Sequence, residues 1–238
     1  YLRQPVAYPD IWNDDVIEWE EQGDTVETCG EILLDRSLPD FVRRKAMIAR
    51  LHPLMAVSPN DPQTRALIAT SLGDVQLYSV LAPLEHLYDK SDGYVRVAVL
   101  QAAGKLFFKR TFGLIIRAAS DRQGQSDPNV RRATIEAINK LHFPHAFDPL
   151  SRLHRDADDP QVNQSALGSI GRIQLLEAVE YLIGVLLHGT QDERRQAAEL
   201  LARHDMPETS LALQNAMAHE SVEVAREIQN ILRRRGGR

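Results

Sequence analysis

The sequence repeats itself with a period near 32 residues, and this period restricts the possible folds more than any other feature. Val130 and five equivalent positions form a series with spacings of 31, 35, 32, 31 and 31 residues: Thr64, Val95, Val130, Val162, Glu193 and Val224. A period of this length is typical of solenoids, in which similar units stack on one another. Because each unit contacts only its neighbours, such a chain needs no single large core.

Each copy of the repeat predicts a helix, called here an anchored helix. In the clearest copy Asp127 can cap the free N–H groups of a helix start, and Pro128 follows where a missing N–H costs nothing. Apolar residues then recur at steps of three and four: Val130, Ala133, Ala137, Ile138 and Leu141. Eight residues after the anchor the side chains are apolar, and nine residues after it they are mostly small, which would let neighbouring helices approach closely. One such helix cannot bury its apolar face alone, so we expect a stack of helix pairs.

Shorter apolar segments between the anchored helices predict the second helix of each pair. They are Leu77–Tyr88, Thr111–Ala119, Ala146–Arg155, Leu176–His188 and Pro207–Ala218, with Pro39–Met55 as the partner of the first anchored helix. The one long spacing, 35, falls at the polar stretch Ser120–Ser126, which we expect to be a loop insertion. The basic run Arg233–Arg238 is expected to end the last helix and fray.

These residues resemble those of a known family. The start Asp127-Pro128-Asn129-Val130-Arg131, an alanine three residues after the anchor, and endings of the type Leu167-Gly168-Ser169-Ile170 resemble HEAT repeats, most of all the short bacterial variety of phycobilisome-lyase-type proteins. The resemblance covers about residues 39–235. It implies an all-α, right-handed superhelical solenoid of about six helix pairs, with the anchored helices lining the concave side.

Residues 1–38 form an acidic leader before the repeats. Residues 1–35 hold ten acids against one base, a charge of −9, so by subtraction from the total of −5 the remaining chain carries +4. Trp12, Val16 and Trp19 lie at helical spacing in this leader. We favour a helical cap over the apolar end of the stack, although the same helix could anchor a partner. The expected organisation is leader 1–38, repeats 39–235 and tail 236–238.

Charged residues flank the anchor in two columns. Aspartates stand three residues before it at Asp61, Asp92, Asp127 and Asp159, and arginines one residue after it at Arg65, Arg96 and Arg131, with a further member at Arg194. The arginines could be anion ligands. The resemblance implies instead an internal Asp–Arg ladder, which we favour.

A second set of basic residues predicts a binding surface. Positions two, six and ten after the anchor share one helix face, because they are four residues apart. The cations on this face, called here the basic stripe, are Lys105, Lys140, Arg172, Arg203 and Arg234, supported by Arg132, Arg195 and Arg226. Cations at helix C-terminal ends also offset the macrodipole, worth about 0.3–1 kcal/mol each, so the same column has a purely structural explanation.

The favoured function is a non-catalytic scaffold that binds an acidic protein or peptide segment along the basic stripe. Nucleic acid is a weaker alternative, because the pI is near 5.9 and phosphate binding usually depends on a strongly basic domain. The main alternative, which the family resemblance alone implies, is an enzyme subunit of the phycobilin-lyase type, although no residue can be matched to a bilin site.

Other chemistry has little support in the sequence. The single Cys29 excludes an internal disulfide. His142, His145 and His154 could suggest a metal site, but His142 falls at a turn between helices, His154 lies about nine residues further on, and no Cys is near. We therefore expect no catalytic residues, metal or cofactor. No apolar run approaches the roughly 20 residues of a membrane span, and no signal peptide is recognisable, so we expect a soluble protein, with the cytoplasm as the favoured compartment.

Overall fold

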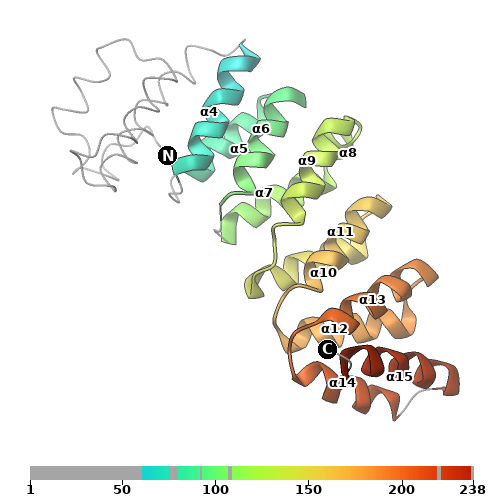
Figure 1. The fold of residues 1–238 in the computed structure, drawn as a ribbon. Helices are drawn as coiled ribbons and strands as arrows, with labels where there is room; N and C mark the ends of the chain where they lie inside the picture. Colours follow the sequence, from blue (N-terminus) through green and yellow to red (C-terminus); the bar gives the residue numbers. More distant parts are fainter. Residues whose placement is uncertain (1–60, 76–79, 92, 107–108, 219–220, 237–238) are drawn as a thin grey trace, which may run out of the picture. The chain divides into compact units, whose positions relative to one another are not determined.

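The computed structural model describes residues 61–75, 80–91, 93–106, 109–218 and 221–236 (Figure 1). The chain divides into two compact units, unit 1 (Tyr1–Ala137) and unit 2 (Ile138–Arg238). The predicted leader 1–38 and the predicted helix Pro39–Met55 lie outside the described residues. Within the described residues every regular element is a helix, which confirms the all-α class.

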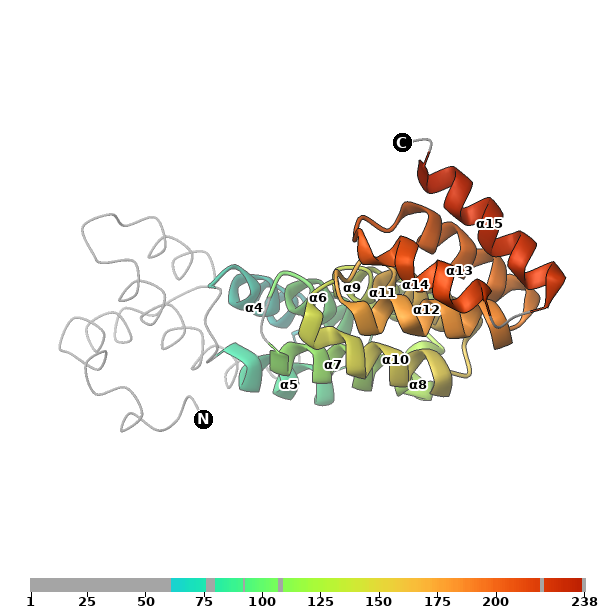
Figure 2. The ribbon, with the colours of Figure 1, turned by 90° about the horizontal axis from the view of Figure 1, so that it is seen from below.

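Unit 1 is built of helices that alternate between two rows. They are α4 (Pro62–Val75), α5 (Leu81–Asp89), α6 (Gly93–Ala103), α7 (Lys109–Ser120), α8 (Arg122–Gln125) and α9 (Pro128–Ile138). α4 packs mainly on α6, and α5 packs on both of them and on α7. Figure 2 shows α4 and α6 in one row and α5 and α7 in the other. This is the predicted stack of helix pairs.

Unit 2 continues the same pattern. Its elements are the 3-10 turn η3 (Pro144–Ala146), α10 (Phe147–Asp156), α11 (Pro160–Ile170), α12 (Leu176–His188), α13 (Gln191–Arg203), α14 (Glu208–Met217) and α15 (Val222–Gly236). The anchored helices α11, α13 and α15 contact one another in succession, and α10, α12 and α14 each pack on the anchored helix that follows. The predicted helix Leu176–His188 is observed with the same ends, and the other described second helices agree within a few residues.

The predicted apolar columns form the core. The valine anchors Val95, Val130 and Val162 are at most 1% exposed. The residues eight positions later are fully buried in five copies: Leu72, Ala103, Ile138, Ile170 and Leu201. These two columns place one face of each anchored helix against its neighbours, as the sequence period requires.

Small residues in the next column allow close helix contact, as predicted. A Cβ added to Gly73 on α4 would lie 2.7 Å from the Cβ of Ala102 and 2.8 Å from its Cα, on α6. A Cβ added to Gly171 would lie 2.6 Å from a terminal carbon of Leu200 on α13. In both units the column therefore sets how near neighbouring anchored helices can come.

The residue three positions before the anchor is a helix cap in all five copies whose cap residue is described. Asp159 accepts from the backbone N–H of Gln161 at 2.8 Å, and Asp61 and Asp127 accept in the same way. The fifth copy replaces aspartate by Thr190, which forms a reciprocal capping box with Glu193. In the sixth copy the Ser221 hydroxyl lies 3.5 Å from the backbone N–H of Val224. The glutamate at the fifth anchor position is therefore part of the cap, which explains why this copy departs from the valine pattern.

The predicted loop at Ser120–Ser126 is instead ordered around a short helix, α8. Gly124 is buried, and the side-chain amide of Gln125 donates to the carbonyl of Ala118 at 2.8 Å and to the hydroxyl of Thr134 at 3.0 Å. The prediction of a loop was therefore wrong, because part-buried hydrogen bonds hold the insertion on α7 and α9.

The predicted fraying of Arg233–Arg238 is also wrong for its described part. α15 continues to Gly236, and Arg235 donates to the carbonyls of Leu201 at 2.8 Å and Met206 at 2.9 Å. None of the described helices is long and apolar enough to cross a membrane.

Candidate functional site

Described residues of unit 2 form three hollows along its anchored helices. The first, of about 800 Å³, lies between α13 and α15 and is lined by Gly189, Gln191, Arg194, Arg195, Ala198, Glu199, Glu227, Asn230, Ile231 and Arg234. The second, of about 610 Å³, lies between α11 and α13. The third, of about 520 Å³, is formed at the C-terminal ends of the same two helices. All three are open to solvent, so this face can receive a chain segment rather than an enclosed small molecule.

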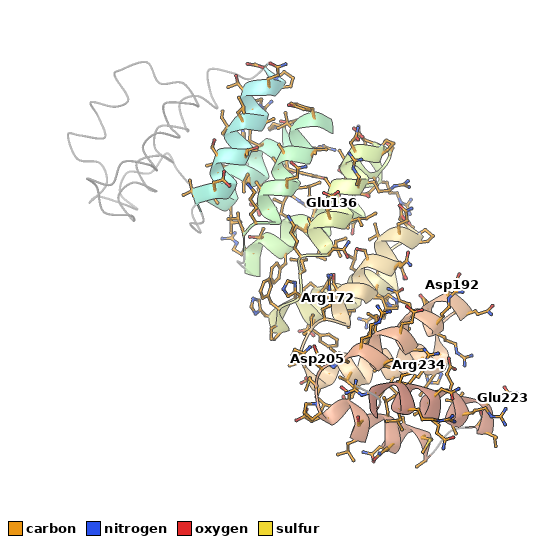
Figure 3. All side chains as sticks on the ribbon, viewed as in Figure 1. Glu136, Arg172, Asp192, Asp205, Glu223 and Arg234 are labelled. Carbon is orange, nitrogen blue, oxygen red and sulfur yellow. The ribbon has the colours of Figure 1, made fainter. Side chains whose placement is uncertain are left out.

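Four residues of the predicted basic stripe line these hollows. Arg195 on α13 and Arg234 on α15 line the two walls of the first hollow. Arg172 and Arg203, which follow one another in the same column, line the third. Figure 3 labels Arg172 and Asp205 of this hollow and Arg234 of the first. Lys140 and Arg226 are exposed outside the lining of the three hollows. Four of the six stripe residues of unit 2 therefore lie beside a hollow.

Two of these cations already have partners. The Arg172 guanidinium donates to the carbonyl of Asn139 at 2.5 Å and to the hydroxyl of Ser169 at 3.1 Å, and burial lowers the pKa of Arg172. Ser169 in turn donates to the carbonyl of Ile138 at 2.8 Å. Arg172 thus satisfies free carbonyls at the end of a helix, the structural role that its position allowed.

Arg195 pairs with Asp192 one turn earlier, at 2.5 Å. Both side chains are largely exposed, 73% and 87%, so the pair is worth little and can rearrange toward another anion.

The other four stripe cations of unit 2 have no partner among the described residues. The side chains of Lys140, Arg203, Arg226 and Arg234 are exposed and make no hydrogen bond or ion pair with any residue that the structure describes. These four are therefore the members of the stripe that are available to a ligand.

The charge along this face is not uniform. Three arginines and two glutamates line the first hollow, and one of those glutamates, Glu227, is paired with Arg194 at 3.3 Å. The second hollow is lined by four carboxylates and one arginine, Arg195. Carboxylates are thus in excess in the second hollow, whereas arginines outnumber carboxylates in the first and third.

The comparisons with known proteins bear on the repeat itself. The family model described as HEAT repeats matches residues 116–202. This segment is therefore similar to HEAT repeats. It contains the copies anchored at Val130, Val162 and Glu193, on which the sequence resemblance rested.

One solved structure that is similar to the chain is the complex of CpcE and CpcF of phycocyanin lyase from Nostoc sp. PCC7120. The match has 19% identity and covers 89% of this chain and 95% of that chain, with a TM-score of 0.39. No curated protein matches the chain.

Stripe residues in unit 1 have local partners. Lys105 pairs with Asp74 at 2.7 Å, across neighbouring repeats, and Arg132 donates to the side chain of Asn129 at 3.3 Å. Both cations are exposed. Lys105 therefore serves partly to join α4 to the end of α6.

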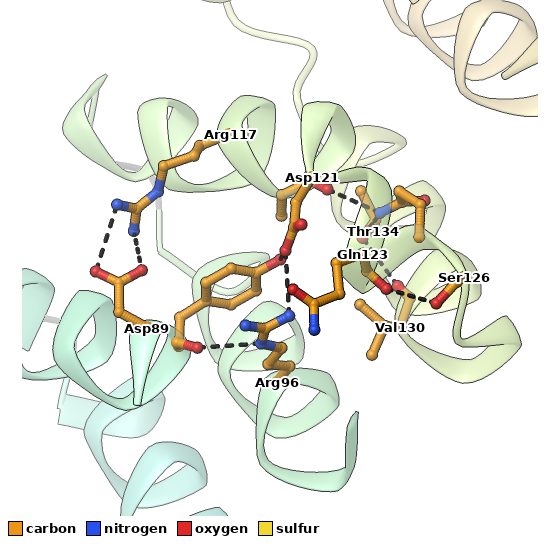
Figure 4. A network of polar contacts seen from close by, with 11 residues as sticks. Asp89, Arg96, Arg117, Asp121, Gln123, Ser126, Val130 and Thr134 are labelled. Atoms are coloured by element: carbon orange, nitrogen blue, oxygen red, sulfur yellow. Dashed lines mark hydrogen bonds and ion pairs between the residues drawn. The ribbon is translucent and has the colours of Figure 1, made fainter. Parts of the chain in front are cut away.

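The arginines one residue after the anchor bind groups between repeats. Arg96 pairs with Asp121 at 3.1 Å and donates to the carbonyl of Tyr88 at 3.1 Å (Figure 4). Arg65 donates to the carbonyl of Lys90 at 3.1 Å. Asp92 lies outside the described residues, and Arg131 is half-buried. The pairing of Arg65 and Arg131 with the aspartate column stays a prediction, whereas the partner of Arg96, Asp121, comes from the insertion.

The buried Tyr88 is the centre of this polar network, and sequence reasoning did not identify it. Its ring lies under the Arg96 guanidinium at 4.9 Å, and its hydroxyl is 3.4 Å from the Asp121 carboxylate. Burial, together with the Asp121 charge, raises the pKa of Tyr88 to about 12. The available signal was the place of Asp121 in the one insertion that lengthens the repeat, because inserted polar residues can make contacts that the other repeats lack.

The burial of two histidines in unit 2 was also not predicted from the sequence. His154 on α10 lies with Nδ1 2.8 Å from the Tyr181 hydroxyl and with Nε2 3.6 Å from the Glu193 carboxylate. His204, directly after α13, is hydrogen-bonded through both ring nitrogens. Burial lowers the pKa of each ring. The described residues contain no cluster of three or more potential metal ligands.

Proposed function

We propose that this chain is a non-catalytic scaffold that holds an acidic segment of a partner protein against the α11–α13–α15 face of unit 2. The observation that carries the proposal is the hollow between α13 and α15, with Arg195 and Arg234 on its walls. Arg203 and Arg226 add unengaged positive charge on the same two helices. An acidic segment could bind Arg203, Arg226 and Arg234 without breaking an internal contact with a described residue, and it would compete with Asp192 for Arg195.

The magnitude of surface electrostatics explains why several cations are needed. One exposed ion pair contributes about 0–1 kcal/mol, so a single contact gives little affinity. Electrostatic complementarity mainly raises association rate and specificity, and both fall as salt screens the charges. We therefore expect binding that depends on salt and on the stripe as a set.

The basic residues differ in their suitability as partner contacts. Arg203, Arg226 and Arg234 have no structural role among the described residues and are the primary contacts of the proposal, with Lys140. Arg195 can exchange its exposed pairing with Asp192. Arg172, Lys105 and Arg132 contribute charge from positions where they also stabilise the repeats.

Site-specific crosslinking tests the proposal directly. A photo-reactive amino acid at Asn230, in the α13–α15 hollow, should crosslink one protein partner, and the crosslinked peptide should be acidic. The same group at Gln214, exposed on α14, is the matched control and should give no such product. A basic crosslinked segment, or equal capture from both positions, would contradict the proposal.

Charge reversal provides the second arm. R203E/R234E should reduce capture at least tenfold, while R152E/R233E, a double reversal of exposed arginines outside the three hollows, should leave it unchanged. Circular dichroism of both variants should match that of the wild type, since these side chains are exposed. If the chain instead binds a tetrapyrrole, visible absorption will appear on mixing and will not depend on these arginines.

A further inference from the structure

His204 occupies a position where three elements meet. It follows α13 directly and is 4% exposed. Its Nε2 lies 3.1 Å from the carbonyl of Ile173, and its Nδ1 lies 3.1 Å from the hydroxyl of Thr209 on α14. A carbonyl can only accept, so Nε2 carries the hydrogen, and the neutral ring accepts from Thr209 through Nδ1. The neutral imidazole is therefore fully satisfied.

Arg235 fastens α15 to the same loop. Its guanidinium donates to the carbonyls of Leu201, His204 and Met206 and to the hydroxyl of Ser210 at 3.2 Å. Charge-assisted hydrogen bonds to several acceptors at once are among the stronger polar contacts in proteins. The attachment of the end of α15 therefore depends on the conformation of residues 201–206.

A proton on His204 would disturb this arrangement. The imidazolium would add positive charge in a buried site close to Arg235, and Thr209 would have to turn its hydroxyl from donor to acceptor. Asp205 in the same loop favours the charged ring, but its side chain is exposed. The groups facing His204 are thus a carbonyl at the end of α11, a hydroxyl on α14 and a cation on α15.

We propose that His204 is an acid-sensitive latch, which holds α15 on unit 2 while the ring is neutral and loosens it when the ring is protonated. Burial, with a further contribution from Arg235, lowers the pKa of His204 below its ordinary value of 6.5. A group whose pKa is lowered by folding stabilises the fold above its unfolded pKa. This contribution is lost as the pH falls from 6.5 toward the folded pKa.

Hydrogen exchange of the α15 amides tests the latch. After correction for intrinsic exchange, protection of α15 should fall severalfold between pH about 7.5 and about 5.5 in the wild type. H204Q retains a donor for Ile173 but does not titrate in this range, so its α15 protection should not change with pH. H154Q removes the other buried histidine, which faces Glu193 and Tyr181, and should keep the wild-type response.

An equal pH response in the wild type and H204Q would overturn the proposal. NMR titration of the His204 ring provides a second measurement that does not depend on H204Q folding. The ring should titrate below 6.5, and R235Q should raise its pKa toward that value; titration at or above 6.5 in the wild type would also overturn the latch. Neither experiment uses a partner, so their outcome is separate from that of the scaffold proposal.

Discussion

The two units use the same repeat but employ their charged residues differently. In the described part of unit 1, Lys105 and Arg96 are paired with Asp74 and Asp121 on other elements. In unit 2, Arg203 and Arg234 make no such contacts with described residues, and they lie beside open hollows. The comparison shows that an equivalent position in a repeat can join helices in one copy and remain available to a ligand in another.

The units also differ in their buried polar groups. Unit 1 buries Tyr88 under an arginine and beside a carboxylate, and raising its pKa to about 12 keeps the tyrosine neutral over the physiological range. Unit 2 buries two histidines, whose ordinary pKa of 6.5 lies within that range. We therefore expect the stability of unit 2 to respond more strongly to mild acid.

The largest expected effect concerns the close approach of anchored helices in each unit. G73A should destabilise unit 1 by about 2–3 kcal/mol, because the new Cβ meets the Ala102 backbone of α6. G171A in unit 2 should cost about 1 kcal/mol or less, because the side chain of Leu200 can turn away. Chemical denaturation measures both. Equal costs would show that the α4 and α6 backbones move apart in unit 1 as easily as the Leu200 side chain turns in unit 2.

G113A is the matched control for these two substitutions. Its added Cβ meets nothing within 4 Å on the exposed side of α7. It should stabilise the protein by about 0.5–1 kcal/mol, since alanine reduces the entropy of the unfolded chain.

A second prediction concerns the polar network of unit 1. D121A should destabilise unit 1 by about 2 kcal/mol, because Arg96 and the Tyr88 hydroxyl lose a common acceptor in a half-buried site. D89A removes a comparable ion pair with Arg117, but both of those side chains are about half exposed. It should cost less than about 1 kcal/mol. If D89A is as costly as D121A in thermal or chemical denaturation, burial is not what makes the network important.

The smallest expected effect tests the use of the basic stripe directly. K105E should destabilise unit 1 by up to about 1 kcal/mol. It breaks the ion pair with Asp74 and places a glutamate carboxylate beside the Asp74 carboxylate, which repels it. R234E, at the equivalent position in unit 2, should change stability by less than about 0.5 kcal/mol, since its guanidinium has no internal partner among the described residues. A stability loss for R234E as large as that for K105E would remove the distinction between the units.

Sequence reasoning identified the helices and the core because both are determined locally. The spacing of Val95, Val130 and Val162 indicates which face of each helix is buried. A cap residue such as Asp159 accepts from backbone N–H groups only two or three positions away. The same reasoning failed for the insertion. Its polar residues have the composition of a loop, but Gln125 and Asp121 find partners on elements that are distant in sequence.

The candidate surface was only partly predictable. The column of cations was visible in the sequence, and the hollows beside Arg195, Arg203 and Arg234 lie along it. The engagement of Arg172 with Asn139, 33 residues earlier, was not visible. Neither was the excess of carboxylates in the second hollow, because it combines residues from two repeats.

The sequence by itself determined the all-α repeat, the helix starts and the residues that face inward, since these follow from periodicity and from contacts within one helical turn. Only the tertiary structure decided which charged and titratable groups are used internally. Arg235 binds carbonyls about 30 residues earlier, and His204 donates to Ile173 across a repeat boundary. The physical reason is that hydrogen bonding and desolvation depend on which backbone groups and charges lie within about 3 Å in space.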